Sequence, residues 1–207
     1  MNILVADDHA IVRKGLIELL RDEFPKCEIF EAVNSNEVMQ HIKNRSLDIV
    51  LLDISMPGRN GIETLKQIRT NGVKTPVLML SMHPEDQYAI RALKAGASGF
   101  MNKEAATEEL LTAVHNILKG KKYIPYSVAE KLLESNDIGN KQPHELLSDR
   151  ELDVLQKIAS GKTVSEIAND LSLSVNTIST YRARLLEKLG LTTTAALARY
   201  AIDHNLA

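Results

Sequence analysis

The sequence predicts an α/β domain built on a doubly wound parallel sheet, followed by a smaller all-α domain. Over the first 119 residues, short apolar runs alternate with segments of helical period, as in five successive β/α units. Runs such as Ile49–Leu52 are almost continuously apolar, which is typical of strands buried on both faces of a sheet. From residue 146 onward the strand pattern is absent and helical segments remain.

The elements of the α/β domain follow one another in strict alternation. The predicted strands are Ile3–Ala6, Glu28–Val33, Ile49–Leu52, Pro76–Leu80 and Gly99–Met101. The predicted helices, one after each strand, are Ile11–Arg21, Asn36–Asn44, Ile62–Thr70, Glu85–Ala95 and Glu108–Lys119.

Residues 120–145 are predicted to be a linker. Tyr123-Ile124-Pro125 should end the preceding helix, and Ser127–Glu134 has the length of a short helix of its own. The stretch from Ser135 to Pro143 is rich in Asn, Asp and Gly, a composition that favours an irregular connection.

The domain over residues 146–207 is predicted to hold four helices. Ser148 with Glu151, and Thr163 with Glu166, fit the capping box, in which a hydroxyl and a carboxylate satisfy the first backbone N–H groups of a helix. The third helix is predicted from Ser174 to Leu189 with Gly190 at its end, and the fourth from Thr193 or Thr194 to His204.

Composition limits the classes of protein to consider. Of 207 residues, 44% are hydrophobic and 25% charged, which suits folded domains in water. No apolar run approaches the roughly 20 residues of a membrane helix, and the strand-like start Asn2–Ala6 predicts no secretion signal. Cys27 is the only cysteine, so an internal disulfide is excluded and a reducing cytoplasm is expected. The net charge is −2, so any binding of nucleic acid must use a local patch.

Polar side chains follow the predicted strands at the points where the strands end. The carboxyl ends of parallel strands meet at one edge of a sheet, where α/β proteins place their ligands. The residues that would converge there are Asp7, Asp8, Asp53, Ser81 and Lys103.

Three carboxylates at one edge repel one another, and Mg²⁺ is the cation whose preference for carboxylate, water and phosphate oxygens matches them. A carboxylate can also attack phosphorus to give an aspartyl phosphate, whose charge Lys103 would help to neutralise. Each residue alone has an ordinary alternative: Asp7 and Asp8 as helix caps, Asp53 as a turn residue, Lys103 as a solvated lysine. Their coincidence at successive strand ends favours a site.

These residues resemble the receiver domain of two-component response regulators. The resemblance covers, in order and spacing, Asp7-Asp8, the segment Asp53 to Gly61, Ser81, and the segment Gly99 to Lys103. It implies a flavodoxin-like doubly wound (βα)5 fold.

The resemblance also implies a role for each pocket residue. Asp53 would accept a phosphoryl group from a sensor histidine kinase, while Ser81 and Lys103 would contact that group. Mg²⁺ would be held by Asp7, Asp8, Asp53 and the backbone at Ser55. Phe100 would be the aromatic switch residue, with a simple core phenylalanine as the alternative.

Two other proteins with such a sheet fit the sequence less well. A flavodoxin that binds FMN needs an uncharged, hydroxyl-rich loop after the first strand, where this chain has Asp7-Asp8-His9. A phosphatase of the haloacid dehalogenase type carries a second Asp two residues after its nucleophile, where this chain has Ser55. His9 itself is interpreted as a loop-lining or kinase-facing residue in preference to a metal ligand, and His83 as a residue that affects access of water.

The C-terminal segment resembles the LuxR/NarL-type helix-turn-helix over nearly all of residues 146–207. The matching residues include Leu147 to Leu155, Gly161, Glu166 to Ala168, Leu171 to Ser174, Thr177-Ile178 and Lys188 to Gly190. The resemblance makes Ser174–Leu189 the recognition helix that enters the major groove of DNA.

A helical wheel tests the recognition helix independently. Ile178, Leu185 and Leu189 share an apolar face, and the opposite face is small and polar. Asn and Arg can contact adenine and guanine edges, and Thr methyl groups can contact thymine, although a merely solvated face is the alternative. The candidate DNA-binding residues are Asn176, Thr177, Ser179, Thr180, Arg182, Ala183 and Arg184.

Two positions depart from the helix-turn-helix pattern, because many members carry Lys where this chain has Ser179 and His where it has Tyr181. Loss of a lysine weakens electrostatic binding to DNA phosphates, so we expect one domain to bind DNA weakly and two domains to bind paired half-sites as a homodimer.

Phosphorylation would draw Ser81 and Lys103 toward the phosphoryl group, repack Phe100 inward and favour that dimer.

The sequence therefore predicts a cytoplasmic transcription regulator and not an enzyme. A signalling adaptor whose output is protein binding or RNA control is the competing function.

Overall fold

The computed structural model describes the chain except residues 83–84, 105–106, 135–141, 205 and 207, and the side chains of 85–87, 107 and 131–134. Two compact units are present, Met1–Asn136 and Asp137–Ala207. His83 lies outside the described residues.

The first unit is built on a five-stranded sheet whose paired strands are all parallel. The strand order is β2-β1-β3-β4-β5, so the chain winds first toward one edge and then back toward the other. The strands are β1 (Asn2–Ala6), β2 (Glu28–Ala32), β3 (Ile49–Asp53), β4 (Val77–Ser81) and β5 (Gly99–Asn102). The predicted doubly wound sheet is confirmed.

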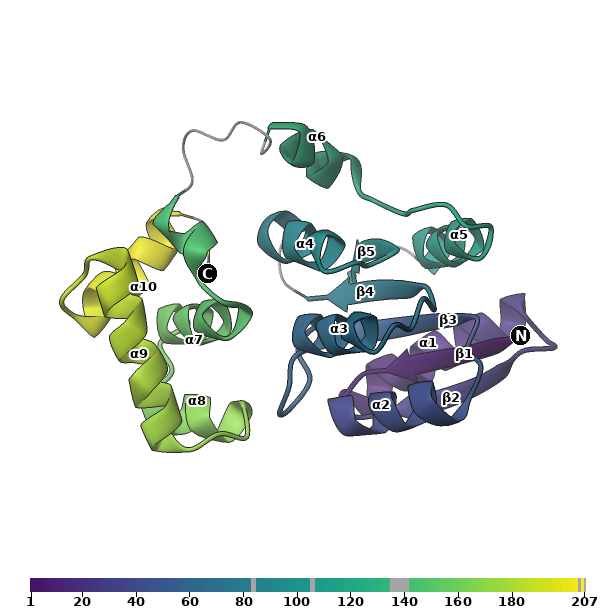
Figure 1. Cartoon of the computed structure of the whole chain (residues 1–207), viewed down its shortest axis with the longest axis horizontal. Coiled ribbons are helices and arrows are strands. Elements are labelled where there is room, and N and C mark those ends of the chain that lie inside the picture. Colours follow the sequence, from purple (N-terminus) through teal and green to yellow (C-terminus); the bar gives the residue numbers. More distant parts are fainter. Residues whose placement is uncertain (83–84, 105–106, 135–141, 205, 207) are drawn as a thin grey trace. The chain divides into compact units, whose positions relative to one another are not determined.

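Helices cover both faces of this sheet (Figure 1). They are α1 (Ala10–Glu23), α2 (Ser35–Asn44), α3 (Gly61–Thr70), α4 (Glu85–Lys94) and α5 (Thr107–Leu118). Helices α1 and α5 pack together on one face, while α3 contacts both α2 and α4 on the other. Between α1, α5 and the sheet lies a core of fully buried aliphatic side chains, among them Leu20, Leu51 and Leu78.

The edge of the sheet beside β5 is extended by a residue that the sequence placed in the linker. Tyr123 pairs with Gly99, the N–H of Phe100 donates to the Tyr123 carbonyl oxygen at 3.1 Å, and the Tyr123 N–H donates to Ser98 O at 3.1 Å. A side chain at position 99 would place its Cβ 2.8 Å from that carbonyl oxygen, which explains glycine there. A further helix, α6 (Tyr126–Glu134), follows and contacts α4.

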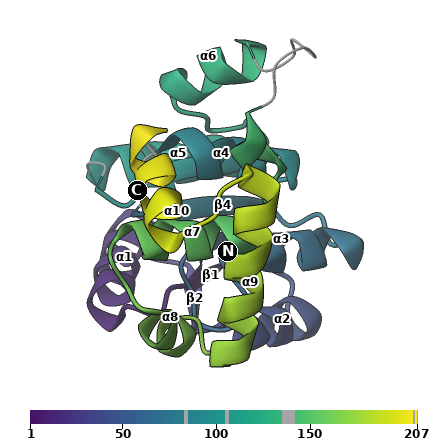
Figure 2. The same ribbon diagram turned by 90° about the vertical axis from the view of Figure 1, so that its left-hand side faces the viewer.

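The second unit is helical. A short 3₁₀ helix, η1 (Pro143–Leu146), is followed by α7 (Asp149–Ala159), α8 (Val164–Asp170), α9 (Val175–Leu189) and α10 (Thr194–Asp203). In both views α8 lies by one end of α9 (Figures 1 and 2). The core of the unit includes Ile167, Ile178, Leu185 and Leu197, all inaccessible to solvent. The predicted all-α domain is confirmed, whereas η1 was not predicted.

The predicted helix ends of this unit are observed. Ser148 and Glu151 form a capping box on α7, and Thr163 and Glu166 form one on α8. At the end of α9, Gly190 has φ of +66°, in the left-handed region that favours glycine.

Among the helices of the described part of the chain, none is both long and apolar enough to cross a membrane.

Candidate functional site

The carboxyl ends of the central strands form a buried acidic pocket in the first unit. Lys103 Nζ lies 2.7 Å from Asp7 Oδ2 and 2.9 Å from Asp53 Oδ2. The side chains of Asp7 and Asp53 are inaccessible to solvent, and that of Lys103 is 4% exposed. The structure therefore brings together three of the residues that the strand-end rule predicted.

Asp7 and Asp8 follow β1 and lead into α1, but neither is the N-cap of that helix. The N-cap is His9, and its side chain makes no capping hydrogen bond. Asp7 instead turns back, and its Oδ1 accepts a hydrogen bond from the His9 N–H at 2.8 Å. Asp8, with a side chain 30% exposed, lies at the mouth of the pocket. The capping alternative for the two aspartates is not what the structure shows.

Asp53 is held by the loop that joins β3 to α3. The Ser55 N–H donates to Asp53 Oδ1 at 3.1 Å, while the N–H of Gly61 donates to Ile54 O at 2.8 Å. A Cβ at position 61 would overlap the backbone carbonyl of Asp53, so only glycine permits this close return of the chain. Asn60 then caps α3 by accepting a hydrogen bond from Glu63 N at 2.9 Å.

Ser81 and Phe100, the two predicted switch residues, lie on the neighbouring strands β4 and β5. Ser81 ends β4 with no exposed surface, and its carbonyl oxygen accepts a hydrogen bond from Lys103 N at 2.8 Å. This bond fixes the backbone at the start of the Lys103 side chain. Phe100 is already fully buried, so the predicted switch would have to exchange one buried position for another.

The surroundings of Asp53 disfavour the negative charge of its carboxylate. Burial raises the pKa of Asp53, and the neighbouring Asp7 raises it further, whereas Lys103 and the Ser55 N–H lower it. The balance is a pKa above the ordinary value. Asp53 is thus a carboxylate that gains from additional positive charge nearby.

The donor set of the pocket fits a divalent cation. One ligand atom each from Asp7, Asp8, His9 and Asp53 lies within 4.8 Å of all the others. Asp7 Oδ2 and Asp53 Oδ2 are buried, and within the described chain their partner is the single ammonium of Lys103, which leaves negative charge in excess. Carboxylate oxygens at this spacing suit Mg²⁺. Ser55 has an exposed side chain and contributes its backbone N–H to Asp53.

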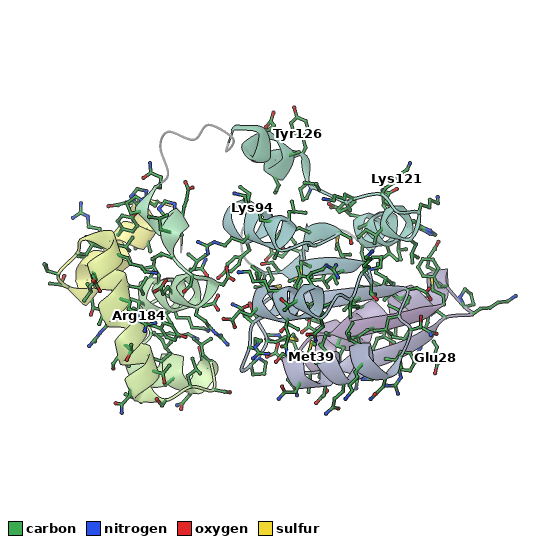
Figure 3. All side chains as sticks on the ribbon, in the orientation of Figure 1. Glu28, Met39, Lys94, Lys121, Tyr126 and Arg184 are labelled. Carbon is green, nitrogen blue, oxygen red and sulfur yellow. The ribbon has the colours of Figure 1, made fainter. Side chains whose placement is uncertain are left out.

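In the second unit, α9 presents the polar face that the wheel predicted. Ile178 and Leu185 are buried, whereas Asn176, Thr180 and Arg184 are exposed. Arg184 is labelled on this helix in Figure 3. Ala183 is also exposed, and Thr177, Ser179 and Arg182 are half-buried.

Sequence reasoning missed one contact that fixes α9. Lys188 Nζ, in the last turn of the helix, lies 2.7 Å from Glu151 Oε2, and the same oxygen accepts hydrogen bonds from the N–H and hydroxyl of Ser148. These partners hold the pKa of Glu151 below its ordinary value despite burial. The capping pattern revealed the Ser148 contact, but nothing in the sequence pairs residues that lie 37 positions apart.

A buried acidic pocket on a doubly wound sheet, joined in one chain to a helix-turn-helix unit, defines a two-domain regulatory protein. Residues 3–115 match the response regulator receiver domain, and residues 145–201 match the bacterial regulatory proteins of the luxR family. The chain belongs to the response regulators that join a receiver domain to a LuxR-type helix-turn-helix.

Known response regulators are similar to this chain over nearly its full length. Response regulator UvrY of Escherichia coli K12 is 32% identical, over 100% of this chain and 95% of its own. RcsB of Salmonella enterica serovar Typhimurium, solved on the promoter rprA with the phosphomimetic BeF3⁻, is 28% identical with a TM-score of 0.62, covering 97% of this chain and 98% of its own. A structure of two RcsB dimers bound to two parallel DNAs has 31% identity and a TM-score of 0.57, with 97% of each chain covered.

Proposed function

We propose that a sensor histidine kinase phosphorylates this response regulator on Asp53, and that the phosphorylated protein binds promoter DNA as a homodimer to regulate transcription. The observation that carries the proposal is the buried ion pair between Asp53 and Lys103 at the end of β3. A regulator of this kind acts where the chromosome is, in the cytoplasm, and it turns over no substrate of its own.

In the transfer, a carboxylate oxygen of Asp53 forms a bond to phosphorus as the bond from phosphorus to the kinase histidine breaks. Lys103 is already within ion-pair distance of the attacking carboxylate, so a short movement would let its ammonium pair with the phosphoryl group. The Ser81 hydroxyl at the end of β4 would donate to a phosphoryl oxygen. Mg²⁺ held by Asp7, Asp8, Asp53 and the backbone carbonyl of Ser55 would supply further positive charge.

Phosphorylation adds about 1.5 to 2 negative charges to a pocket that already carries an excess. Movement of Ser81 and Lys103 toward the phosphoryl group would change the packing at β4, β5 and Phe100, and thereby the surface around α4 and α5. We propose this surface as the one whose change favours the dimer. Residues 120–145, which include Tyr123 at the sheet edge and α6, would join the two domains.

The proposed DNA contacts are on α9. Asn176, Thr180, Ala183 and Arg184 are exposed on its polar face, and Thr177, Ser179 and Arg182 flank them. The Thr180 hydroxyl donates to the Asn176 carbonyl oxygen at 2.9 Å, and its methyl group would contact a thymine. RcsB, which is similar to this chain over nearly its whole length, is bound to promoter DNA in its structure, and this supports promoter binding by the present chain.

The proposal is tested by fluorescence anisotropy with a DNA fragment from upstream of the chain's own coding region. Beryllofluoride with Mg²⁺ should tighten binding of the wild type by about 5–150-fold, the usual range of allosteric coupling. Asp53→Asn should bind with the same affinity with and without beryllofluoride. Wild type that binds no DNA under either condition would overturn the promoter-binding proposal and favour the protein-binding adaptor.

A further inference from the structure

His9 lies beside the acidic pocket with its imidazole turned toward the carboxylates. Its Nδ1 is 3.0 Å from Asp8 Oδ1 and 3.5 Å from Asp7 Oδ1. The side chain is 61% exposed, so a ring that pointed away from the pocket would be free to hydrate. The ring nevertheless lies against the carboxylates of the pocket.

In the described part of the chain, the imidazole of His9 contacts the carboxylates of Asp8 and Asp7, which belong to the pocket itself. Although His9 is the N-cap of α1, its side chain makes no capping hydrogen bond. Its backbone N–H donates to Asp7 Oδ1, and its backbone carbonyl oxygen accepts a hydrogen bond from Arg13 N at 3.0 Å. The ring thus caps no helix end, and its Nδ1 faces the same carboxylates that would bind a cation. His115 also pairs with a carboxylate, through Nε2 at 2.7 Å from Glu23 Oε1, but that pair joins the helices α1 and α5 and is not part of the acidic pocket.

The ligand atoms of the pocket lie close enough together to bind one ion. An octahedral ion with bonds of about 2.1 Å places opposite ligands about 4.2 Å apart. The donor atoms of Asp7, Asp8, His9 and Asp53 lie within 4.8 Å of one another, so shortening the longest separation by about 0.6 Å would bring all four onto one ion. Two of them, Asp7 and Asp53, come from fully buried side chains whose Oδ2 atoms have Lys103 as their partner in the described chain.

We propose that His9 Nδ1 is a ligand of the cation in this pocket, which makes the site a mixed oxygen–nitrogen site. The inference rests on the proposed cation site and departs from the sequence interpretation of His9 as a loop-lining or kinase-facing residue. Imidazole adds affinity for late first-row ions such as Ni²⁺ and Co²⁺, whereas Mg²⁺ prefers oxygen and gains little from it. The pocket would thus accept these ions more readily than three carboxylates alone would.

The test is isothermal titration of the full-length protein with Mg²⁺, Mn²⁺ and Ni²⁺, for wild type, His9→Gln and His115→Gln. We expect His9→Gln to lower the Ni²⁺ affinity by at least about tenfold, equivalent to about 1.4 kcal/mol, and to change the Mg²⁺ affinity by less than about twofold. His115→Gln is the matched control, since it removes another carboxylate-paired histidine outside the pocket, and should change neither. Asp8→Asn should weaken all three ions.

Electron spin echo spectroscopy of bound Mn²⁺ gives a second readout, independent of phosphorylation. Nitrogen modulation from a directly bound imidazole should be present in the wild type and absent from His9→Gln. Equal loss of Mg²⁺ and Ni²⁺ affinity in His9→Gln, or wild-type Mn²⁺ without nitrogen modulation, would overturn the ligand role and leave the cation site standing. Wild type that binds neither Mg²⁺ nor Mn²⁺ would remove the cation site itself, and the inference with it.

Discussion

Lys103 Nζ lies between two buried carboxylates, 2.7 Å from Asp7 Oδ2 and 2.9 Å from Asp53 Oδ2. One ammonium thus joins the end of β1 to the end of β3 from the loop that follows β5. Because Asp53 carries the proposed phosphoryl group, the same contact serves both the stability of the unit and its proposed chemistry.

Replacing Lys103 by Met should destabilise the receiver domain strongly. Removal of one partner from a buried ion pair leaves charge uncompensated and typically costs about 3–5 kcal/mol. Urea unfolding followed by far-UV circular dichroism measures the loss. The double variant Lys103→Met with Asp53→Asn should recover part of it, because one of the two carboxylates is then neutral. A double variant no more stable than Lys103→Met alone would contradict this coupling.

Asp53→Asn should stabilise the metal-free protein at neutral pH. Because burial raises the pKa of Asp53, the folded state binds its proton more tightly than the unfolded state does. The stability contributed by Asp53 is therefore fully present below the ordinary pKa of 3.8 and is lost as pH rises through the higher folded-state value.

The difference in melting temperature between Asp53→Asn and wild type, measured in the presence of a chelator, should accordingly grow from acidic to neutral pH. A difference of about 1 kcal/mol would move the midpoint by about 4–8 °C in a domain of 60–100 residues and somewhat less in a larger one. A difference that shrinks with rising pH would mean that Lys103 outweighs burial, and that the pKa of Asp53 is lowered.

Gly61→Ala should disturb the pocket, because a Cβ at position 61 would overlap the Asp53 carbonyl. We expect a loss of about 1–3 kcal/mol in unfolding free energy, the usual cost of forcing extra atoms into a packed site, together with weaker Mg²⁺ binding. Gly15→Ala is the control, since a Cβ there meets nothing within 4 Å. That change lies inside α1 and should stabilise by about 0.5–1 kcal/mol. Equal stability of the two variants would be inconsistent with a close approach at Gly61.

Arg184→Ala should weaken DNA binding through the exposed face of α9. If Arg184 reads a guanine, binding to the preferred sequence should weaken by about 1–3 kcal/mol; if it contacts a phosphate, the slope of log affinity against log salt should fall by about one. Arg199→Ala is the control of equal charge, because Arg199 is exposed on α10 and pairs with Asp203. Titrations at several salt concentrations separate the two roles, and identical behaviour of both variants would exclude Arg184 from the interface.

The architecture and most of the pocket could be predicted from local patterns. Short apolar runs and helical patterns, together with capping residues such as Ser148 and Thr163, marked most of the elements that the structure contains. The rule that parallel strands end at one edge was then enough to bring Asp7, Asp53 and Lys103 together.

The contacts that could not be predicted depend on tertiary structure. Tyr123 pairs with Gly99 although the segment around it has no strand pattern, because a free edge beside β5 offers backbone groups to it. The direction of the His9 ring depends on the backbone turn between β1 and α1. The Glu151–Lys188 pair depends on the crossing of α7 and α9.

The most direct measurement is mass spectrometry of the full-length protein after incubation with acetyl phosphate and Mg²⁺, followed by peptide mapping. One phosphoryl group should appear on the wild type, map to Asp53, and be absent from Asp53→Asn. A wild type that gains no phosphoryl group, or carries it on another residue while Asp53→Asn is modified equally, would contradict the assignment of Asp53 as the phosphoacceptor.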